Sequence, residues 1–477
     1  MKRVLRISVY LVCGVTLLLA LLHLEENWRG KRAWEAWKAE RIAKGDRYDW
    51  LNLAPPEVPD ADNFAKEPLV EAAITGHGSL LKDFKWPDPM PKFADWRLGQ
   101  HEDLDAWAAG YKTKDLETSF APWESQLDEL VGASRRTACR FPIRYTYPEM
   151  SQDAIPAVFT FRAVARALRL RALARLHAGK ADEALEDTLA ILHVARHLQR
   201  EPSFMVSQMQ MALTGIAMQP VWEGVADHRW NDAQLSALGQ ALQGINLIVS
   251  QRRAVESDRV YTALTFQAGL DTGSWAQAKM NSPNLSDFDE SFHVRPHPVR
   301  TMVHWLLVPK GWTYQNMLNA DRFDVEIWFP VLDPDMHRVD AMSLKDALNR
   351  LSSIKPGPYH LAGNIAFPAM VNQSERMAYR QNALDEAIVA CALERYRLAH
   401  RGYPGSMTVL APAYLAKIPC DITTGAPLHY RRNADGSFDL YSVGWDGKDD
   451  GGKVVTDKEG RADDSEGDWT WPHPAAY

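Results

Sequence analysis

The hydrophobic positions along this chain follow three different patterns. Residues 7 to 24 form one apolar run without a charged side chain, which is typical of a membrane-spanning helix. Between residues 155 and 268, and again from 375 to 400, apolar residues recur every three or four positions, the period of a helix packed on one face. Near the C-terminus the period falls to two, as in strands. The pattern predicts a mainly α protein with an N-terminal transmembrane helix and a small C-terminal α+β module.

The N-terminal segment, residues 1–24, is predicted to be an uncleaved membrane anchor. The run from Ile7 to Leu24 would span about 27 Å as a helix, close to the hydrocarbon thickness of a bilayer. A cleavable signal peptide is the alternative, but no small-residue cleavage site follows the apolar run. Basic residues stand on both sides of the run, so the positive-inside rule leaves the orientation open.

Two segments are expected between the anchor and the main body. Residues 25–45 are predicted to continue the anchor helix as a stalk, with Trp34 and Trp37 suited to the depth of lipid headgroups. Residues 46–150 are rich in proline and tryptophan, which predicts an irregular wrapping segment with short helices over residues 94–109 and 123–133. Its tryptophans either dock the segment on the body, the favoured interpretation, or line a sugar- or peptide-binding surface. These residues are Trp50, Trp86, Trp96, Trp107 and Trp123.

The body, residues 151–370, is predicted to be an irregular bundle or solenoid of antiparallel helices. Residues 159–200 resemble one tetratricopeptide-type hairpin, with Asp182 as the N-cap of its second helix. A second copy does not follow at the expected period, so a tandem array is not predicted. Further helices are expected over residues 232–268, 300–307, 313–329, 343–352 and 375–400, with a polar break at 269–299.

The composition argues against nucleic-acid binding and leaves open whether two of the cysteines form a disulfide. The net charge is −7 over 477 residues, and no basic face stands out that could bind nucleic-acid phosphates. Four cysteines do not make a disulfide framework in a chain of this length. Cys139 and Cys420 could pair in an oxidising compartment, but the sequence gives no geometry with which to test this pairing.

Catalytic signatures are absent from the sequence. It contains no H-E-x-x-H, no G-x-S-x-G and no phosphate-binding glycine loop. His193 and His197 stand one helical turn apart, a spacing that can hold a metal, but no carboxylate completes the set and a solvated helix face is favoured. Asp333, Asp335 and His337 form a turn cluster whose catalytic partners, if it has any, the sequence does not identify.

The C-terminal module, residues 371–477, has the most specific order of residues. A long helix runs into Gly402–Tyr–Pro404, and alternating strands are predicted over residues 427–432 and 437–443. From Asp446 onward nine carboxylates stand against four basic residues. A glycine-rich acidic loop of this kind either remains solvated or bends round a hard cation such as calcium.

This order of elements, over about residues 370–470, resembles the C-terminal part of the major pseudopilins of type II secretion systems. In those proteins a long helix, a Gly-Tyr-Pro corner, a turn built on aspartate, glycine and proline, a small sheet and a calcium loop follow in the same order. The resemblance implies that carbonyls near Ser442 and several acids of the tail form a calcium loop. These acids are Asp446, Asp449, Asp450, Asp463 and Asp464. The pseudopilin processing signal is absent after Gly14, and the module follows a long helical body instead of the anchor helix.

The sequence thus predicts a single-pass protein of the bacterial inner membrane, and the resemblance implies an extracytoplasmic body. The expected function is non-catalytic: a scaffold or interaction protein of the cell envelope, associated with a secretion or pilus-like assembly. Its expected partners are the membrane and other proteins. The alternative is an extracytoplasmic hydrolase whose dispersed active-site residues a single sequence does not reveal.

Overall fold

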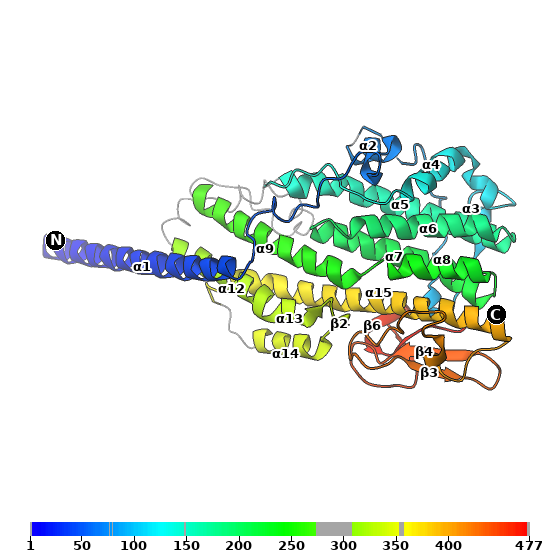
Figure 1. Cartoon of the computed structure of the whole chain (residues 1–477). Helices are drawn as coiled ribbons and strands as arrows, with labels where there is room; N and C mark the ends of the chain where they lie inside the picture. The colour runs from blue at the N-terminus through cyan, green and yellow to red at the C-terminus, as the bar shows by residue number, and fades with distance from the viewer. Residues whose placement is uncertain are drawn as a thin grey trace.

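The chain folds into an elongated helical body from which one long helix projects. A computed structural model describes residues 2–75, 77–78, 80–146, 149–272, 308–352 and 357–474. Helix α1 (Lys2–Ala43) stands out from one end of the body, and a small sheet module covers the side of α15 near the other end (Figure 1). The structure is mostly helical, as predicted. The helix expected over residues 300–307, and most of the polar break before it, lie outside the described residues.

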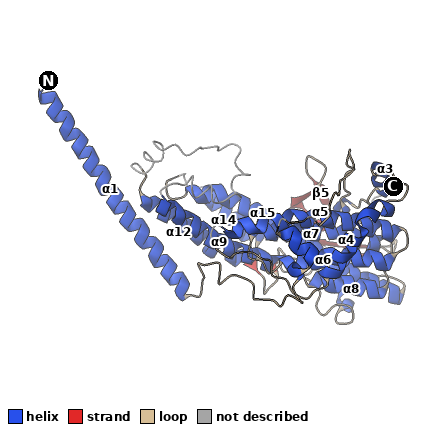
Figure 2. Ribbon diagram, turned by 90° about the horizontal axis from the view of Figure 1, so that it is seen from above, coloured by secondary structure: helices blue, strands red, loops and turns tan. Residues whose placement is uncertain are grey.

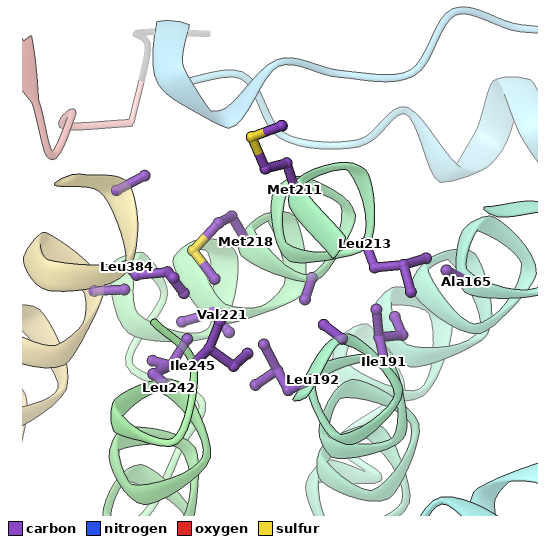
Figure 3. Packing of buried hydrophobic residues seen from close by; sticks show 14 of the residues in the cluster. Ala165, Ile191, Leu192, Met211, Leu213, Met218, Val221, Leu242, Ile245 and Leu384 are labelled. Atoms are coloured by element: carbon purple, nitrogen blue, oxygen red, sulfur yellow. The ribbon is translucent and has the colours of Figure 1, made fainter. Parts of the chain in front are cut away.

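Helix α7 is the centre of the body, and the other long helices pack round it (Figures 1 and 2). Its sequence is apolar on nearly every side, so it is buried along most of its length. Figure 3 shows Met218 and Val221 of α7 among side chains from α6, α8 and α15, which include Leu192, Leu242 and Leu384. The helices of this layer are α5 (Glu149–His177), α6 (Ala181–Leu198), α7 (Phe204–Ala226), α8 (Asp232–Gln243), α9 (Leu247–Thr272) and α15 (Leu361–His400).

Two helix boundaries in the body differ from the prediction. The helix expected over residues 232–268 is divided into α8 and α9, and α8 begins at a reciprocal capping box between Asn231 and Gln234. Asp182 was expected to cap α6, but Lys180 occupies the N-cap position without a side-chain hydrogen bond. Gln234 donates instead to Asp182 at 2.6 Å, so this carboxylate ties α6 to the start of α8.

The wrapping segment lies across the body and is held by its aromatic side chains. Trp50, Trp96 and Trp107 are at most 4% exposed, which confirms the interpretation that they dock the segment. The helix expected over residues 94–109 is two short helices, because Gly99 between them adopts a left-handed backbone. The elements of the segment are η1 (Phe64–Lys66), α2 (Pro68–Ile74), η2 (Trp96–Leu98), α3 (Leu104–Gly110), η3 (Glu117–Trp123) and α4 (Glu124–Ser134).

A second group of elements lies between α9 and α15. Helix α12 (Lys310–Phe323) continues through a π-helical turn, η5 (Asp324–Trp328), into the short helix α13 (Phe329–Val331). A two-stranded antiparallel hairpin and helix α14 follow, so the helices expected over 313–329 and 343–352 are present with slightly different ends. These last elements are β1 (Leu332–Asp333), β2 (Arg338–Val339) and α14 (Ala341–Ser352).

The C-terminal module begins where α15 ends. Arg401 adopts a left-handed backbone (φ 60°) and stops the helix. The predicted hairpin is confirmed: β3 pairs antiparallel with β4, with Tyr430 opposite Leu440, and β7 completes a sheet of order β3-β4-β7. A separate hairpin pairs β5 with β6. The bounds are η6 (Met407–Leu410), β3 (His429–Arg432), β4 (Phe438–Ser442), β5 (Val454–Thr456), β6 (Ala462–Gly467) and β7 (Trp469–Thr470).

Asp421 fixes the turn that leads into β3. Its buried carboxylate accepts hydrogen bonds from the backbone N–H groups of Thr423 (2.9 Å) and Thr424 (3.0 Å). The second oxygen accepts from the N–H of Val443 at 3.0 Å, just beyond β4. Because buried N–H groups need partners, this one side chain joins the turn to the sheet.

A single large hydrophobic core connects these parts. It contains Phe64 of the wrapping segment, Trp222 of α7 and Trp469 of β7. The module is therefore packed on the body through buried apolar surface. All four cysteines are free, so Cys139 and Cys420 are not bonded in this structure.

Candidate membrane anchor and acidic loop

The N-terminal half of α1 exposes a continuous apolar surface. Its side chains lie outside the body, and Leu18, for example, is 70% exposed. By length and composition this helix could cross a membrane, and no part of its apolar stretch is buried against the body. A signal sequence meets the same criteria. The functional question is therefore how the second half of α1 attaches this apolar half to the body.

The two halves of α1 differ sharply at Gly30, where the helix crosses α12. A Cβ atom on Gly30 would lie 2.4 Å from the carbonyl oxygen of Gly311, and one on Gly311 would lie 1.9 Å from that of Glu26. The two backbones are thus in direct contact, which only glycine permits. Asn27 adds a hydrogen bond, since its side-chain oxygen accepts from the N–H of Gly311 at 2.8 Å.

A polar contact closes the same crossing from the other side. Glu26 is buried, and one of its carboxylate oxygens accepts from Arg29 (2.6 Å) and from the hydroxyl of Tyr359 (2.9 Å). Arg29 also donates to the Tyr359 hydroxyl at 2.9 Å. Glu26, two residues beyond the apolar run, is therefore paired inside the protein.

Asp321 of α12 is the centre of a second, deeper contact with α1. It accepts hydrogen bonds from Trp37 of α1 at 2.6 Å and from Tyr48 at 2.7 Å. Arg259 of α9 forms a bidentate ion pair with the same carboxylate, at 2.9 and 3.0 Å. Arg259 also reaches Asp46, so the hub joins α1, α9, α12 and the chain after α1. Bidentate, buried pairs of this kind have a fixed geometry.

The tryptophans of the stalk have a different environment from the predicted one. They were expected at lipid headgroup depth, but Trp34 is only 2% exposed and packs with Trp37, Phe266 and Leu318 in a small core of its own. Trp28, which is 63% exposed, is the ring left outside. Burying two tryptophans gains more free energy than leaving them at an interface, so this half of α1 is part of the body.

Near this contact a buried carboxylate oxygen of Asp324 is not matched by a partner within the described part of the chain. Asp324, in the π-helical turn after α12, is buried, and its Oδ1 atom has no hydrogen-bond partner among the described residues. Burial, with the nearby carboxylates of Asp258 and Asp321, raises the pKa of Asp324 well above its usual value. Both causes favour the protonated form of this carboxyl over the ionised form.

The predicted calcium ligands lie in two separate places. Asp446, Asp449 and Asp450 occupy the loop after β4, where Asp446 pairs with Lys448 and Asp449 accepts from the Tyr441 hydroxyl at 3.2 Å. Asp463 and Asp464 lie on β6, the strand of the second hairpin. The side chain of Asp463 accepts from the N–H of Ser465, and Asp464 lies near Glu375 of α15.

Asp468, which the sequence analysis did not single out, is the acid that organises this loop. Its side chain is 3% exposed, and its Oδ2 atom accepts from the N–H groups of Asp450 (3.0 Å) and Gly452 (2.6 Å). Its Oδ1 atom is buried and has no hydrogen-bond partner. Burial, together with the charges of Asp449 and Asp450, raises the pKa of Asp468. Its position just before a buried tryptophan strand was the available sequence signal.

The fit of a calcium ion to these residues is partial. The orphaned Oδ1 atom of Asp468 is an oxygen donor facing a glycine-rich acidic loop, as a calcium site needs. In the part of the chain that the structure describes, however, no three His, Cys, Asp or Glu side chains are arranged to hold a metal ion. Asp463 and Asp464 are engaged elsewhere. The calcium loop stays a prediction, with Asp468 added to its donors.

The two histidines considered as metal ligands belong to the packing of α6. His197 is buried, stacks on Phe64 at 4.8 Å and lies 3.0 Å from the carbonyl oxygen of Ser134. Burial lowers the pKa of His193 and of His197 to about 4, so both rings are neutral at physiological pH. This is a core environment and not the solvated helix face that was favoured.

His337 of the turn cluster has a partner that the sequence did not identify. Its Nε2 atom lies 2.8 Å from Asp385, a buried carboxylate on α15 that also accepts from Gln381. The next residue, Glu386, is buried beside it and accepts from Asn382 at 2.9 Å. Burial raises the pKa of Glu386 well above its usual value, and the hydrogen bond to Asp385 raises the pKa of His337 against the effect of burial.

These acids lie where the module meets α15. The charges of Asp385 and Asp421 both act on Glu386, and Asp421 is the side chain that fixes the turn of the module. Burial next to two other carboxylates favours the neutral form of Glu386, because ionisation would place uncompensated charge in the interior. The burial of Asp385 and Glu386 could not be predicted from the sequence, because two adjacent acids on a helix are equally compatible with a solvent-facing position.

Comparison with known proteins adds no further assignment: no family model, curated protein or solved structure matches the chain.

Proposed function

We propose that this protein is a single-pass, membrane-anchored scaffold of the bacterial cell envelope. The observation that carries the proposal is the division of α1. One half exposes an apolar surface of bilayer length, and the other half is locked into the body at Gly30 and Trp37. A helix built in this way holds the body at a fixed position relative to the bilayer, which suits a protein that presents surfaces to partners.

The extracytoplasmic side of the inner membrane is the proposed location of the body. The support is the resemblance of the C-terminal module to pseudopilins, together with the hairpin of β3 and β4. Strand β3 is an edge strand of its sheet, so its outer side offers backbone groups to a partner strand. Arg431 pairs with Asp439 of β4, and the exposed charge of Arg432 favours an acidic partner segment of a secretion or pilus-like assembly.

An extracytoplasmic hydrolase is the second candidate, and the His337–Asp385 pair is the observation that favours it. A hydrolase of this kind also needs a nucleophile within hydrogen-bond reach of the histidine. Within the described ranges, the hydrogen-bond partner of the His337 ring is Asp385, and no serine, threonine or cysteine side chain contacts it. The pair joins the β1–β2 turn to α15, which is a structural task.

Calcium is proposed as a ligand of the module. Asp468 would provide Oδ1, and the neighbouring loop would provide Asp450 and backbone carbonyls. A bound calcium ion would neutralise three clustered carboxylates and hold the loop against β7. In the absence of calcium, Asp468 holds the loop by accepting hydrogen bonds from the N–H groups of Asp450 and Gly452.

Fractionation of cells tests the anchor. The full chain is expected in the membrane pellet after carbonate extraction, and a variant that lacks residues 1–24 is expected in the soluble fraction. Protease added to spheroplasts should digest the body of the full chain if the body is extracytoplasmic. A body that is protected in intact spheroplasts and digested only after lysis would contradict this location.

The scaffold function is tested on complexes kept intact in mild detergent. Site-specific photo-crosslinkers at Arg431 and Arg432 should give discrete adducts with an envelope protein, whereas one at exposed Gln240 on α8 should not. Equal adducts at all three positions, or none, would remove the edge strand as a docking site. Loss of a hydrolytic activity on His337→Ala, with folding intact, would instead favour the hydrolase.

A further inference from the structure

A half-buried arginine of α15 stands without a counter-charge. Arg380 lies beside α7, at Gly215, where a Cβ atom would come within 2.9 Å of the Arg380 Nη1 atom. A glycine in the middle of a helix costs roughly 1 kcal/mol relative to alanine. Gly215 therefore leaves room for this guanidinium group at a cost to the stability of α7.

The surroundings of Arg380 do not satisfy its five N–H groups. Among the described residues it has neither a hydrogen bond nor an ion pair, and its one contact of this class is with the Tyr379 ring, 5.9 Å from the centroid. Burial, and then the positive charge of Arg97, lower the pKa of Arg380 to about 10. None of its nitrogen atoms is fully buried, so an anion from solvent can reach this partly desolvated cation.

A second guanidinium group is fixed close by. Arg97 of η2 contacts the same Tyr379 ring, 5.3 Å from its centroid, from a different part of the chain. Asp95 orients it by a bidentate pair, with both contacts at 2.7 Å. Two cations that share one aromatic ring repel each other. A bound anion would remove this repulsion, as in other arginine pairs that recognise oxyanions.

The acids near Arg380 do not take the place of such an anion. Asp95 is engaged by Arg97, and Asp464 acts on Arg380 only from beyond ion-pair distance. Glu375, five residues earlier on α15, has its pKa raised to about 7 by burial and by Asp464, so it is partly neutral. Arg376 stands four residues before Arg380 on the same helix face and is exposed, at the solvent side of the pair.

Figure 3 shows the side of α7 that faces the wrapping segment. Met211, one turn before Gly215, points away from Leu192 and Ile191, toward the wrapping segment. Gly215 follows on this side, and η2 of the wrapping segment contacts α7. The two arginines therefore meet where the wrapping segment, α7 and α15 come together, three elements that are fixed by the core.

We propose that Arg380 and Arg97, with Arg376 at the rim, form a binding site for a small oxyanion, either a phosphate or a carboxylate group. The guanidinium of Arg380 offers paired N–H donors that match two oxygens of such a group. Arg97 is held in place by Asp95 and supplies the second charge. The site lies apart from the membrane anchor, and Asp464 of β6 is the acid of the module whose charge acts on it.

Isothermal titration calorimetry on the full chain in detergent tests this site with two probes. Pyrophosphate and succinate are titrated at constant ionic strength, because one probe carries phosphate oxygens and the other carboxylate oxygens. At least one is expected to bind to the wild-type protein. Arg380→Gln is expected to weaken that binding about tenfold or more, since a charge-assisted bidentate contact is lost. Arg380→Lys keeps the positive charge but lacks the paired N–H donors of a guanidinium group, so its affinity should lie between those of the wild type and Arg380→Gln.

Matched variants separate the site from general charge effects. Arg395→Gln removes an arginine of the same helix that already pairs with Asp232 at 2.8 Å, and it should bind as the wild type does. Gly215→Ala keeps every charge but displaces the Arg380 side chain, so it should weaken binding. The proposal is overturned if neither probe binds the wild-type protein, or if folded Arg380→Gln binds with unchanged affinity.

Discussion

The two ends of the chain are attached to the same helical body by different physics. The C-terminal half of α1 is held by backbone contact at Gly311 and by the Asp321 hub, in which a carboxylate is matched by Arg259 and two neutral donors. The C-terminal module is held by buried tryptophans and by acids that have too few cations. Of these, Glu386 and Asp468 both have raised pKa values.

This difference indicates a permanent joint at one end and an adjustable one at the other. An ion pair that is buried and matched keeps its charges over a wide pH range. Clustered carboxylates change their charge with pH and respond to cations. An anchor helix needs the first property. A module that assembles with partners outside the membrane could use the second to respond to its surroundings.

The largest expected effect comes from the hub. Asp321→Ala removes the bidentate partner of the buried Arg259 guanidinium and leaves Asp46 as its remaining carboxylate, so the cost is up to about 3 to 5 kcal/mol. We expect much of this loss to appear as opening of α1, seen as faster amide hydrogen exchange over residues 30–43. Glu40→Ala removes an exposed pair with Lys44 on the same helix and should leave exchange unchanged. Equal exchange in both variants would contradict the hub.

The glycine crossing gives the next largest effect. Gly311→Ala places a methyl group 1.9 Å from a backbone oxygen of α1, so the helices must separate, at a cost of about 1 to 3 kcal/mol. The control is Gly239→Ala on α8, where a Cβ atom meets nothing within 4 Å. That change should be neutral or stabilising, by about 0.5 to 1 kcal/mol. Chemical denaturation of the solubilised chain measures both.

Raising the pH should loosen the module, and Asp324, whose pKa is also raised, should act in the same direction near the Asp321 hub. The pKa of Glu386 is raised in the folded protein above its ordinary value of 4.5, so the unfolded chain releases this proton first and stability falls as pH rises above about 4.5. The pKa of His337 is also raised, from 6.5, so its contribution is complete below that pH and is lost as pH passes the folded value. Both groups act in the same direction.

Glu386→Gln isolates the larger of these two effects. The amide keeps an oxygen that can accept from Asn382 and cannot ionise, so the variant should lose stability less steeply between pH 5 and pH 8 than the wild type. The readout is amide exchange of β4 and β7 compared with that of residues 30–43. A wild-type module that becomes more stable as pH rises would show that Glu386 is ionised in the folded state.

Calcium gives the smallest expected effect. With an affinity typical of extracytoplasmic modules, millimolar calcium would stabilise the folded chain by roughly 0.5 to 1.5 kcal/mol, and a chelator would reverse the change. Asp468→Asn should remove the response, because it replaces an anionic donor oxygen. Asp457→Asn is the control, since this exposed acid pairs with Arg461 in the turn of the second hairpin. A response that survives Asp468→Asn would place the ion elsewhere.

Much of the fold could be predicted from the sequence because it depends on periodic patterns. The apolar run, the helical spacing of the body and the alternation around β3 and β4 each fix an element without reference to its neighbours. The predictions of a helix cap and of side-chain environments were wrong where a contact with a distant part of the chain replaced the local one. Asp182 is a good N-cap by type, yet it accepts from Gln234 on another helix, and the stalk tryptophans are in the body core.

The candidate sites were harder to predict because they depend on residues far apart in the chain. Asp321 meets Trp37, and His337 meets Asp385, over separations that no local pattern encodes. Acids that were close in sequence were chosen for the calcium loop. The structure instead assigns Asp463 to a different hairpin, and it buries Asp468 in the link between β6 and β7, where the N–H groups of the acidic loop donate to it.

The most direct test of a rigid anchor is a distance measured across the joint. A spin label on native Cys13, in the apolar half of α1, is paired with one on Gln240→Cys, which is exposed on α8. Cys420→Ser removes the one other accessible thiol. In lipid nanodiscs, double electron–electron resonance should give one narrow distance distribution, and Asp321→Ala should broaden it. A broad distribution in the protein with Asp321 intact would show that α1 swings freely and would contradict the account.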